Sequence, residues 1–203
     1  MQAKSCSSIF TALLLGLSAA VGFAQVRNPE AVRWYNAGVL EKDVAKALTA
    51  YEAAVTLDST FVEALFALGY AHNSQKNFVP AERYLSRAAR LMPANMKNSF
   101  KVKIYYELAN AQLSKGDLNA SEESLRRAQS LAKDNKLKTN ITFKLARLLC
   151  QQNRMLEALT ELKARRQEDS KNKDSFDSFI ALIEKEIAAA QTPQPAQAES
   201  TVA

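Results

Sequence analysis

The stretch LFALGYAHNSQKNFVPAERYLSRAARLMP, residues 65–93, decides the fold. Its second part carries apolar or small side chains at steps of three and four, which places them on one face of a helix. They are Phe78, Ala81, Tyr84, Leu85, Ala88 and Leu91. The first part, residues 65–71, shows the same spacing, a polar turn follows at 73–77, and Pro93 ends the second part. The stretch therefore predicts a helical hairpin.

Eight positions of this hairpin correspond to those that define a known repeat, with one departure. They are Leu65, Leu68, Gly69 and His72 in the first helix and Ala81, Leu85, Ala88 and Pro93 in the second. The hairpin resembles the tetratricopeptide repeat (TPR), from which only His72 departs, because the family has an aromatic residue there. Gly69 is small where two helices must approach closely, and Leu85 fills the space beside it.

Weaker copies of the same pattern precede and follow this hairpin. They contain Trp34, Ala37, Gly38, Ala47, Tyr51 and Ala54; Tyr105, Leu108, Ala109, Gly116, Leu125 and Ala128; and Leu145, Ala146, Leu149, Ala158 and Leu162. Starts near Val62, Val102 and Thr139 give periods of 40 and 37 residues, where about 34 is usual. The extra residues, 96–101 especially, should lengthen a helix or a loop. Arg165 stands where the family has a small residue.

Polar residues mark the expected helix starts. Asn28, Pro29 and Glu30 have the order of a cap, a first-turn proline and an acid. The residues expected to cap the second helices are Asp43, Asn77, Asp117 and Asn153. Residues 175–190 have large apolar side chains at helical spacing, which predicts a helix that covers the last hairpin. The expected fold class is all-α: a right-handed α-solenoid of about four TPR-like hairpins plus a C-terminal capping helix.

The composition divides the chain into three parts. Residues 1–24 have the order of a secretory signal peptide, with Lys4 at the start, an uncharged apolar run and small residues before Gln25. Retention as a membrane anchor is the alternative, because the apolar stretch reaches about 18 residues. Residues 25–190 form the expected solenoid domain. Residues 191–203, rich in Gln, Pro, Ala, Ser and Thr, form an expected disordered tail.

Export is the expected location, with the periplasm of a Gram-negative bacterium favoured. Removal of residues 1–24 takes one Lys from a chain of net charge +6 and leaves +5. Cys150 is then the one remaining cysteine, so no intramolecular disulfide forms. Cys150 is expected to be a small buried or half-buried apolar residue.

The residues that catalysis needs do not come together in this sequence. His72 is the one histidine and stands at a packing position, which removes most His-based metal sites and nucleophile–histidine pairs. Glu122 and Glu123 are neighbours on a helix and therefore diverge. Five glycines leave no Gly-rich phosphate loop. We expect no enzyme activity, no catalytic residue, no metal site and no cofactor.

Aromatic residues recur one position after the large residue of each first helix. They are Tyr35, Phe66, Tyr106 and Phe143, and one turn further along stand Val39, Tyr70, Asn110 and Arg147. The resemblance implies that first helices line a groove that holds peptides or partner segments. The candidate partner-binding residues are Tyr35, Phe66, Tyr70, Tyr106, Asn110, Phe143 and Arg147. The alternative is that the four rings pack between neighbouring helices.

Two functions follow from these features. The first is an exported, non-enzymatic adaptor that binds a protein or peptide segment in the groove, with no nucleic-acid partner. The second is a structural envelope protein attracted to anionic lipid or cell-wall polymer through its third and fourth hairpins. Basic residues are concentrated there, among them Arg126, Arg127, Lys133, Lys136, Lys138, Arg165 and Arg166. The alternative is that these residues form an ordinary solvated helical surface.

Overall fold

The computed structural model describes residues 27–191, all of whose regular elements are helices. The α-helices are α1 (Pro29–Leu40), α2 (Val44–Leu57), α3 (Val62–Ser74), α4 (Phe78–Leu91), α5 (Asn98–Ser114), α6 (Leu118–Leu131), α7 (Asn135–Gln151), α8 (Met155–Glu168) and α9 (Lys173–Gln191). A 3-10 turn, η1 (Ser170–Asn172), leads into α9. The expected signal segment, 1–24, and tail residues 192–203 lie outside the described residues.

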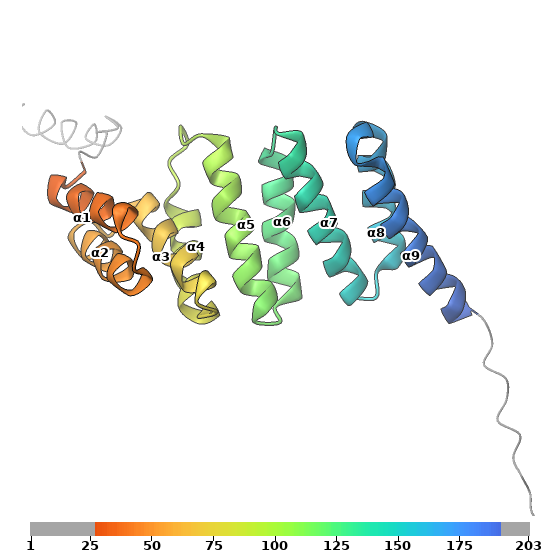
Figure 1. The fold of residues 1–203 in the computed structure, drawn as a ribbon, viewed down its shortest axis with the longest axis horizontal. Coiled ribbons are helices and arrows are strands. Elements are labelled where there is room, and N and C mark those ends of the chain that lie inside the picture. The colour runs from red at the N-terminus through yellow and green to blue at the C-terminus, as the bar shows by residue number, and fades with distance from the viewer. Residues whose placement is uncertain (1–26, 192–203) are drawn as a thin grey trace, which may run out of the picture.

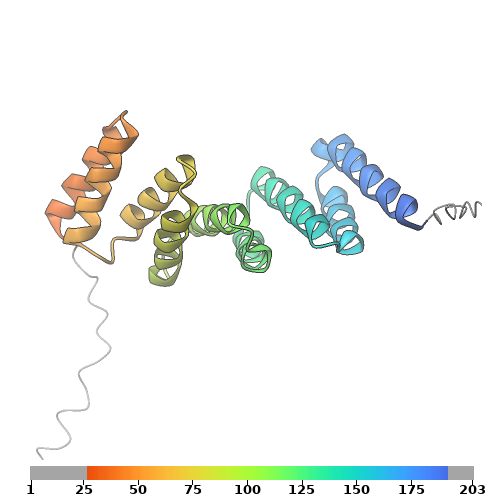
Figure 2. The ribbon, with the colours of Figure 1, turned by 90° about the horizontal axis from the view of Figure 1, so that it is seen from below.

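The helices form four antiparallel hairpins and a final single helix. Figure 1 shows them side by side in one row, from α1 and α2 at one end to α8 and α9 at the other. Figure 2 shows the same row from below, with each hairpin packed against the next. The all-α TPR-type solenoid is confirmed. The extra residues lengthen both a helix and a loop, since α5 has 17 residues against 13 in α3 and the loop at 92–97 precedes it.

Small residues lie where the two helices of a hairpin touch. A Cβ atom added to Gly69 would lie 2.4 Å from Cγ of Leu85, and one added to Gly38 would lie 2.6 Å from Cε1 of Tyr51. Contacts this short do not occur between real side chains, so only glycine allows these helices to approach. Ala81 is fully buried in the same layer.

Three of the expected capping residues make the predicted hydrogen bond. Oδ1 of Asn28 accepts from the backbone N–H of Glu30 at 2.9 Å. Asp43 and Asp117 do the same for the starts of α2 and α6. Asn77 stands at the cap position of α4 without a side-chain hydrogen bond to the helix.

The expected cap at Asn153 is wrong, because this residue belongs to the turn that closes α7. Its φ angle is 61°, and Arg154 is the residue that precedes α8. Lys76 and Gly116 have φ angles of 61° and 84° at the same place in the preceding hairpins. In each turn the next N–H bonds to the carbonyl five residues back, which is the Schellman motif.

Gly116→Ala should destabilise the protein by about 1 kcal/mol, because an alanine at positive φ is strained. A Cβ at this position meets no atom within 4 Å, so the cost is purely conformational. Urea unfolding measures the change. Lys76→Gly is the reciprocal variant and should stabilise the protein, since Lys76 bears the same strain. Equal stability of Gly116→Ala and the wild type would contradict this account.

Arg165 occupies a small-residue position without breaking the repeat. It is 6% exposed, and its Nη1 pairs with Oε2 of Glu168 at 2.8 Å while Nη2 donates to the carbonyl of Asn135 at 3.1 Å. Its Nε donates to the hydroxyl of Thr139, which in turn donates to Asp169. The expectation that Arg165 belongs to a solvated basic surface is therefore wrong: its charge is buried and satisfied.

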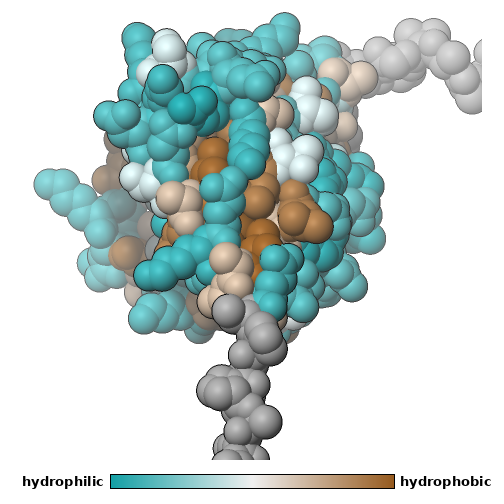
Figure 3. Space-filling model, turned by 90° about the vertical axis from the view of Figure 1, so that its right-hand side faces the viewer, coloured by the Kyte–Doolittle hydropathy of each residue, from teal (hydrophilic) through white to brown (hydrophobic). Residues whose placement is uncertain are grey.

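Within the described residues, an additional helix packs on the C-terminal end of the row and none on the other end. Phe176 and Ile183 of α9 are buried against the preceding hairpin, as expected of a capping helix. Leu182 stays 52% exposed, and Figure 3 shows apolar residues on this end bordered by hydrophilic ones. Trp34, at the large-residue position of α1, is 43% exposed, because no described helix precedes α1.

Candidate functional site

The four recurring rings do not form one continuous strip. All are half-buried, and three of them contact an aromatic ring at or just before the start of the helix two places further along the chain. The ring pairs, with centroid separations, are Tyr35–Phe61 at 5.0 Å, Phe66–Phe100 at 5.0 Å and Phe143–Phe176 at 4.6 Å. Contacts at these distances stabilise the junctions between hairpins. Tyr35, Phe66 and Phe143 thus pack as the alternative expects, and of these three only Phe143 also lines the groove described next.

A groove lies along the first helices α3, α5 and α7, where two pockets of about 560 and 380 Å³ adjoin. We call it the first-helix groove. The larger pocket is lined by Tyr106, Leu113, Asn140, Phe143, Lys144, Arg147, Leu148 and Gln151. The smaller is lined by Tyr70, Asn73, Ser74, Phe78, Glu107, Asn110, Leu113, Ser114 and Lys144. Leu113 and Lys144 belong to both pockets. The groove thus brings together five of the seven candidate residues: Tyr70, Tyr106, Asn110, Phe143 and Arg147.

A chain of polar contacts crosses the groove from α3 to α7. Nδ2 of Asn73 donates to the carbonyl of Glu107 at 2.9 Å and to its Oε2 at 3.2 Å. The same Oε2 accepts from Nδ2 of Asn110 at 3.2 Å. Nζ of Lys144 donates to Oδ1 of Asn110. Oδ1 of Asn73 is buried without a hydrogen-bond partner among the described residues. These contacts link three helices and fix the spacing between them.

The larger pocket is cationic at its centre and aromatic at its sides. Burial lowers the pKa of Lys144; the charge of Glu107 opposes this effect and that of Arg147 adds to it. Nζ of Lys144 lies 5.0 Å from the centroid of Tyr106. Arg147 is exposed on the rim. Rings and cations arranged in this way can hold a chain segment that alternates apolar and acidic or amide side chains.

Sequence reasoning missed Lys144, Leu113 and the Asn73–Glu107 pair. Lys144 directly follows Phe143 and points into both pockets, and Leu113 stands about one turn after Asn110. These positions share the helix face of the residues that were identified, because residues three and four apart lie together. Extending the comparison of first helices to every position on that face would have found them.

Acidic side chains pair with several residues of the predicted basic surface. Arg126 pairs with Glu122 at 2.8 Å, and Arg127 and Arg166 pair with Glu123 and Asp177. Burial acts to raise the pKa of Glu122, but hydrogen bonds from Arg154 and Arg126 outweigh it and hold the pKa below its usual range. Lys133 and Lys136 are exposed and Lys138 is half-buried, and none of the three has an acidic partner within residues 27–191.

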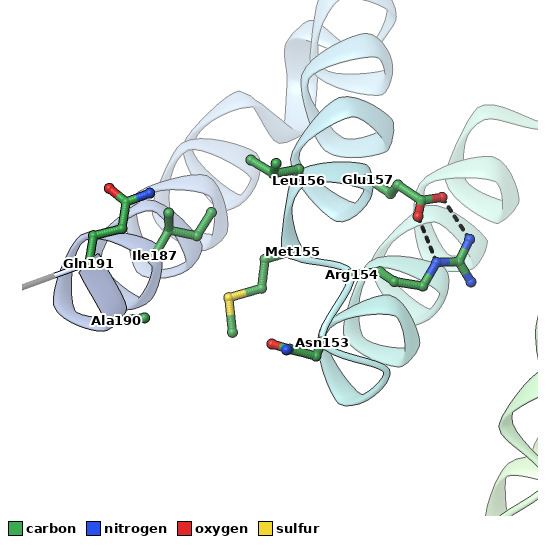
Figure 4. A pocket seen from close by; sticks show the side chains of 8 residues that line it. All are labelled: Asn153, Arg154, Met155, Leu156, Glu157, Ile187, Ala190 and Gln191. Atoms are coloured by element: carbon green, nitrogen blue, oxygen red, sulfur yellow. Dashed lines mark hydrogen bonds and ion pairs between the residues drawn. The ribbon is translucent and has the colours of Figure 1, made fainter.

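A further hollow of about 480 Å³ lies at the C-terminal end, between the start of α8 and the end of α9. Figure 4 shows Met155 facing Ile187 and Ala190 across it, with Arg154 paired to Glu157 at 2.6 Å on the rim. Leu156 beside it is 72% exposed. None of the seven candidate residues lines this hollow.

His72 and Cys150, two of the side chains considered for catalysis, are partly buried by their neighbours. His72 stacks on Tyr84, with centroids 5.6 Å apart and ring planes within 4°; burial lowers its pKa. Cys150 is half-buried, as expected, and burial raises the pKa of its thiol.

No cluster of His, Cys, Asp and Glu within residues 27–191 could hold a metal ion. Among the same residues, no helix combines the length and apolar character that crossing a bilayer requires.

Comparisons with known proteins agree with this architecture. The chain is similar in fold to YrrB, described as a TPR protein with an unusual peptide-binding site, with a TM-score of 0.65 at 20% identity over 79% of each chain. It is also similar to MamA, with a TM-score of 0.60 at 20% identity over 71% of this chain and 75% of that one. No curated protein sequence matches. The sequence model of the tetratricopeptide repeat-like domain matches residues 67–192, and the chain therefore belongs to that family.

Proposed function

We propose that this protein is a non-enzymatic adaptor that binds an extended segment of a partner protein in the first-helix groove. The TPR-like fold supports a protein-interaction scaffold in general terms. The observation that carries the proposal is the pair of adjoining pockets along α3, α5 and α7, joined at Leu113 and Lys144. A segment laid across both pockets would contact three hairpins.

The lining of the groove defines the chemistry of the segment. Tyr106 and Phe143 offer half-buried rings that lose little conformational freedom on binding. Lys144 and Arg147 supply positive charge, and Asn110 and Asn140 supply amide groups. We therefore propose a segment with at least one acidic side chain between apolar ones.

Tyr106→Ala and Arg147→Ala should each weaken binding by about 1–3 kcal/mol, as truncations of interface anchors do. The probes are peptides selected from a displayed random library on the wild-type protein, and the affinities of the variants are measured by calorimetry. Arg147 is exposed, so the thermal unfolding of Arg147→Ala should change little.

Arg33→Ala, an exposed arginine of α1 outside the groove, is the matched control and should bind the peptides like the wild type. Phe66→Ala is expected to lower stability instead, because Phe66 packs on Phe100. Selected peptides that bind equally to wild type, Tyr106→Ala and Arg147→Ala would contradict the groove as the site.

We also propose that the protein is exported to the periplasm of a Gram-negative bacterium, with cleavage after Ala24. The support is the order of charge, apolar run and small residues in 1–24. The expected result is an intact mass, measured on protein from the envelope fraction, that begins at Gln25. A mass that includes Met1 would contradict cleavage and favour a retained anchor.

A further inference from the structure

Two equivalent junctions between hairpins are closed to different extents. At the junction of α6 and α8, long polar side chains bridge the gap: Nη1 of Arg126 lies 3.1 Å from Oε1 of Glu161, and Nε2 of Gln129 donates to Oε2 of Glu161 at 3.2 Å. These bridges fill the space between the two second helices.

The junction of α4 and α6 has small residues at the same repeat positions. Ala81, Ser121 and Ala158 are equivalent in the repeat and set the register. In that register Ser86, Ala89 and Ser124 replace Arg126, Gln129 and Glu161, respectively. Such short side chains cannot span the gap, and a hollow of about 390 Å³ remains between α4, α5 and α6.

Three arginines line this hollow. Arg83 and Arg90 lie seven residues apart on one face of α4, and Arg127 comes from α6. Glu123 is the one acid in the lining and is paired with Arg127. Arg83 and Arg90 have no acidic partner in the described part of the chain, and the four groups together carry a net charge of +2.

Aromatic rings contact two of the three guanidinium groups. The guanidinium carbon of Arg83 lies 4.9 Å from the centroid of Tyr84, and that of Arg127 lies 5.7 Å from the centroid of Tyr105. Ser124 donates to Oε1 of the buried Gln112 at 2.8 Å, which fixes the floor. Stacking on Tyr105, which itself lines the hollow, restricts Arg127 before any ligand arrives and so lowers the entropic cost of binding.

We propose that this hollow binds a phosphate monoester group. Guanidinium groups present paired N–H donors that match phosphate oxygens, and Arg is favoured over Lys for this geometry. A phosphate monoester carries about −1.5 to −2 charge at pH 7, which balances the +2 of the lining. A single carboxylate would leave about half of that charge uncompensated. The ester could belong to a soluble metabolite or to the headgroup of phosphatidic acid.

The test titrates the full chain with glycerol 3-phosphate and follows binding by calorimetry. Arg83→Ala and Arg90→Ala should each weaken binding about tenfold or more, as expected for the loss of a hydrogen bond to a charged group. Arg33→Ala and Tyr106→Ala should leave the affinity unchanged, which separates this site from general positive charge and from the first-helix groove. Arg83 and Arg90 are exposed, so their replacement should preserve the fold.

Glu123→Gln provides a test in the opposite direction. Removal of this carboxylate releases Arg127 and should tighten binding of glycerol 3-phosphate several-fold. Asp174→Asn changes the net charge equally from the distant first turn of α9 and should have no effect. A gain in affinity with both variants would show general attraction and overturn the proposal.

A second arm distinguishes the sources of the phosphate. Vesicles containing phosphatidic acid are compared with vesicles of phosphatidylcholine alone in a sedimentation assay. Binding of phosphatidic acid vesicles that is lost in Arg83→Ala and Arg90→Ala, without measurable affinity for glycerol 3-phosphate, assigns the site to the lipid headgroup. Absence of binding to both probes, or binding that these substitutions leave unchanged, would overturn the proposal.

Discussion

Ala88→Asp is expected to unfold the second hairpin and to lower the free energy of unfolding by about 4 kcal/mol or more. Ala88 is fully buried in the core that joins α3 and α4 to the first hairpin and to Ile104 of α5. An aspartate there places a carboxylate among apolar atoms without a cation to pair with. Urea unfolding followed by circular dichroism measures the loss.

Ala164→Asp is the matched control for this variant. Ala164 lies at an exposed position of α8, so the substitution carries the same loss of helix propensity without burying a charge. It should cost less than about 1 kcal/mol. Similar losses in the two variants would show that propensity, and not burial, sets the effect, and would place Ala88 outside the core.

Phe176→Ala should destabilise the protein by about 3–5 kcal/mol, the range of buried aromatic truncations. Phe176 is fully buried at the start of α9, and its ring stacks on Phe143 of α7 with centroids 4.6 Å apart. Truncation leaves a cavity under the capping helix and removes the support of a ring that lines the first-helix groove. We expect α9 to detach first, because the end of a solenoid has neighbours on one side only.

Hydrogen exchange of the α9 amides, read together with urea unfolding, checks this result. Phe179→Ala is the control, since Phe179 is only half-buried and its ring lies 6.1 Å from that of Phe143. It should have a clearly smaller effect on both measurements. Unchanged exchange in α9 of Phe176→Ala would contradict the capping role of this helix.

The hairpins could be predicted from the sequence because their information is local. Apolar residues at steps of three and four define the helix faces, and Pro93 and the caps at Asn28, Asp43 and Asp117 define the ends. The small residues at helix contacts, such as Gly69 opposite Leu85, follow from the same pattern. Asn153 was misassigned because a polar residue before a helix fits both a cap and a left-handed turn, and the backbone φ decides between them.

The candidate site could be predicted only in part. Position in the repeat placed Tyr70, Tyr106, Asn110, Phe143 and Arg147 on the first helices, and all five line the first-helix groove. The same rule gave Tyr35 and Phe66, whose rings are covered by Phe61 and Phe100. Those partners stand just before or at the start of the next first helix, so their contact depends on how hairpins stack and not on the spacing within one hairpin.

The sequence by itself determined the helices, the repeat and the family, because periodicity and small-residue positions act within some 30 to 40 residues of chain. Tertiary structure decided which side chains are available. It buried Arg165 among Asn135, Thr139 and Asp169, and it brought Lys144 to Asn110 across two hairpins. It also left the hollow at α4 and α6 open where the next junction is bridged. Exposure and pairing depend on distances between hairpins, and those distances are fixed only when the hairpins pack.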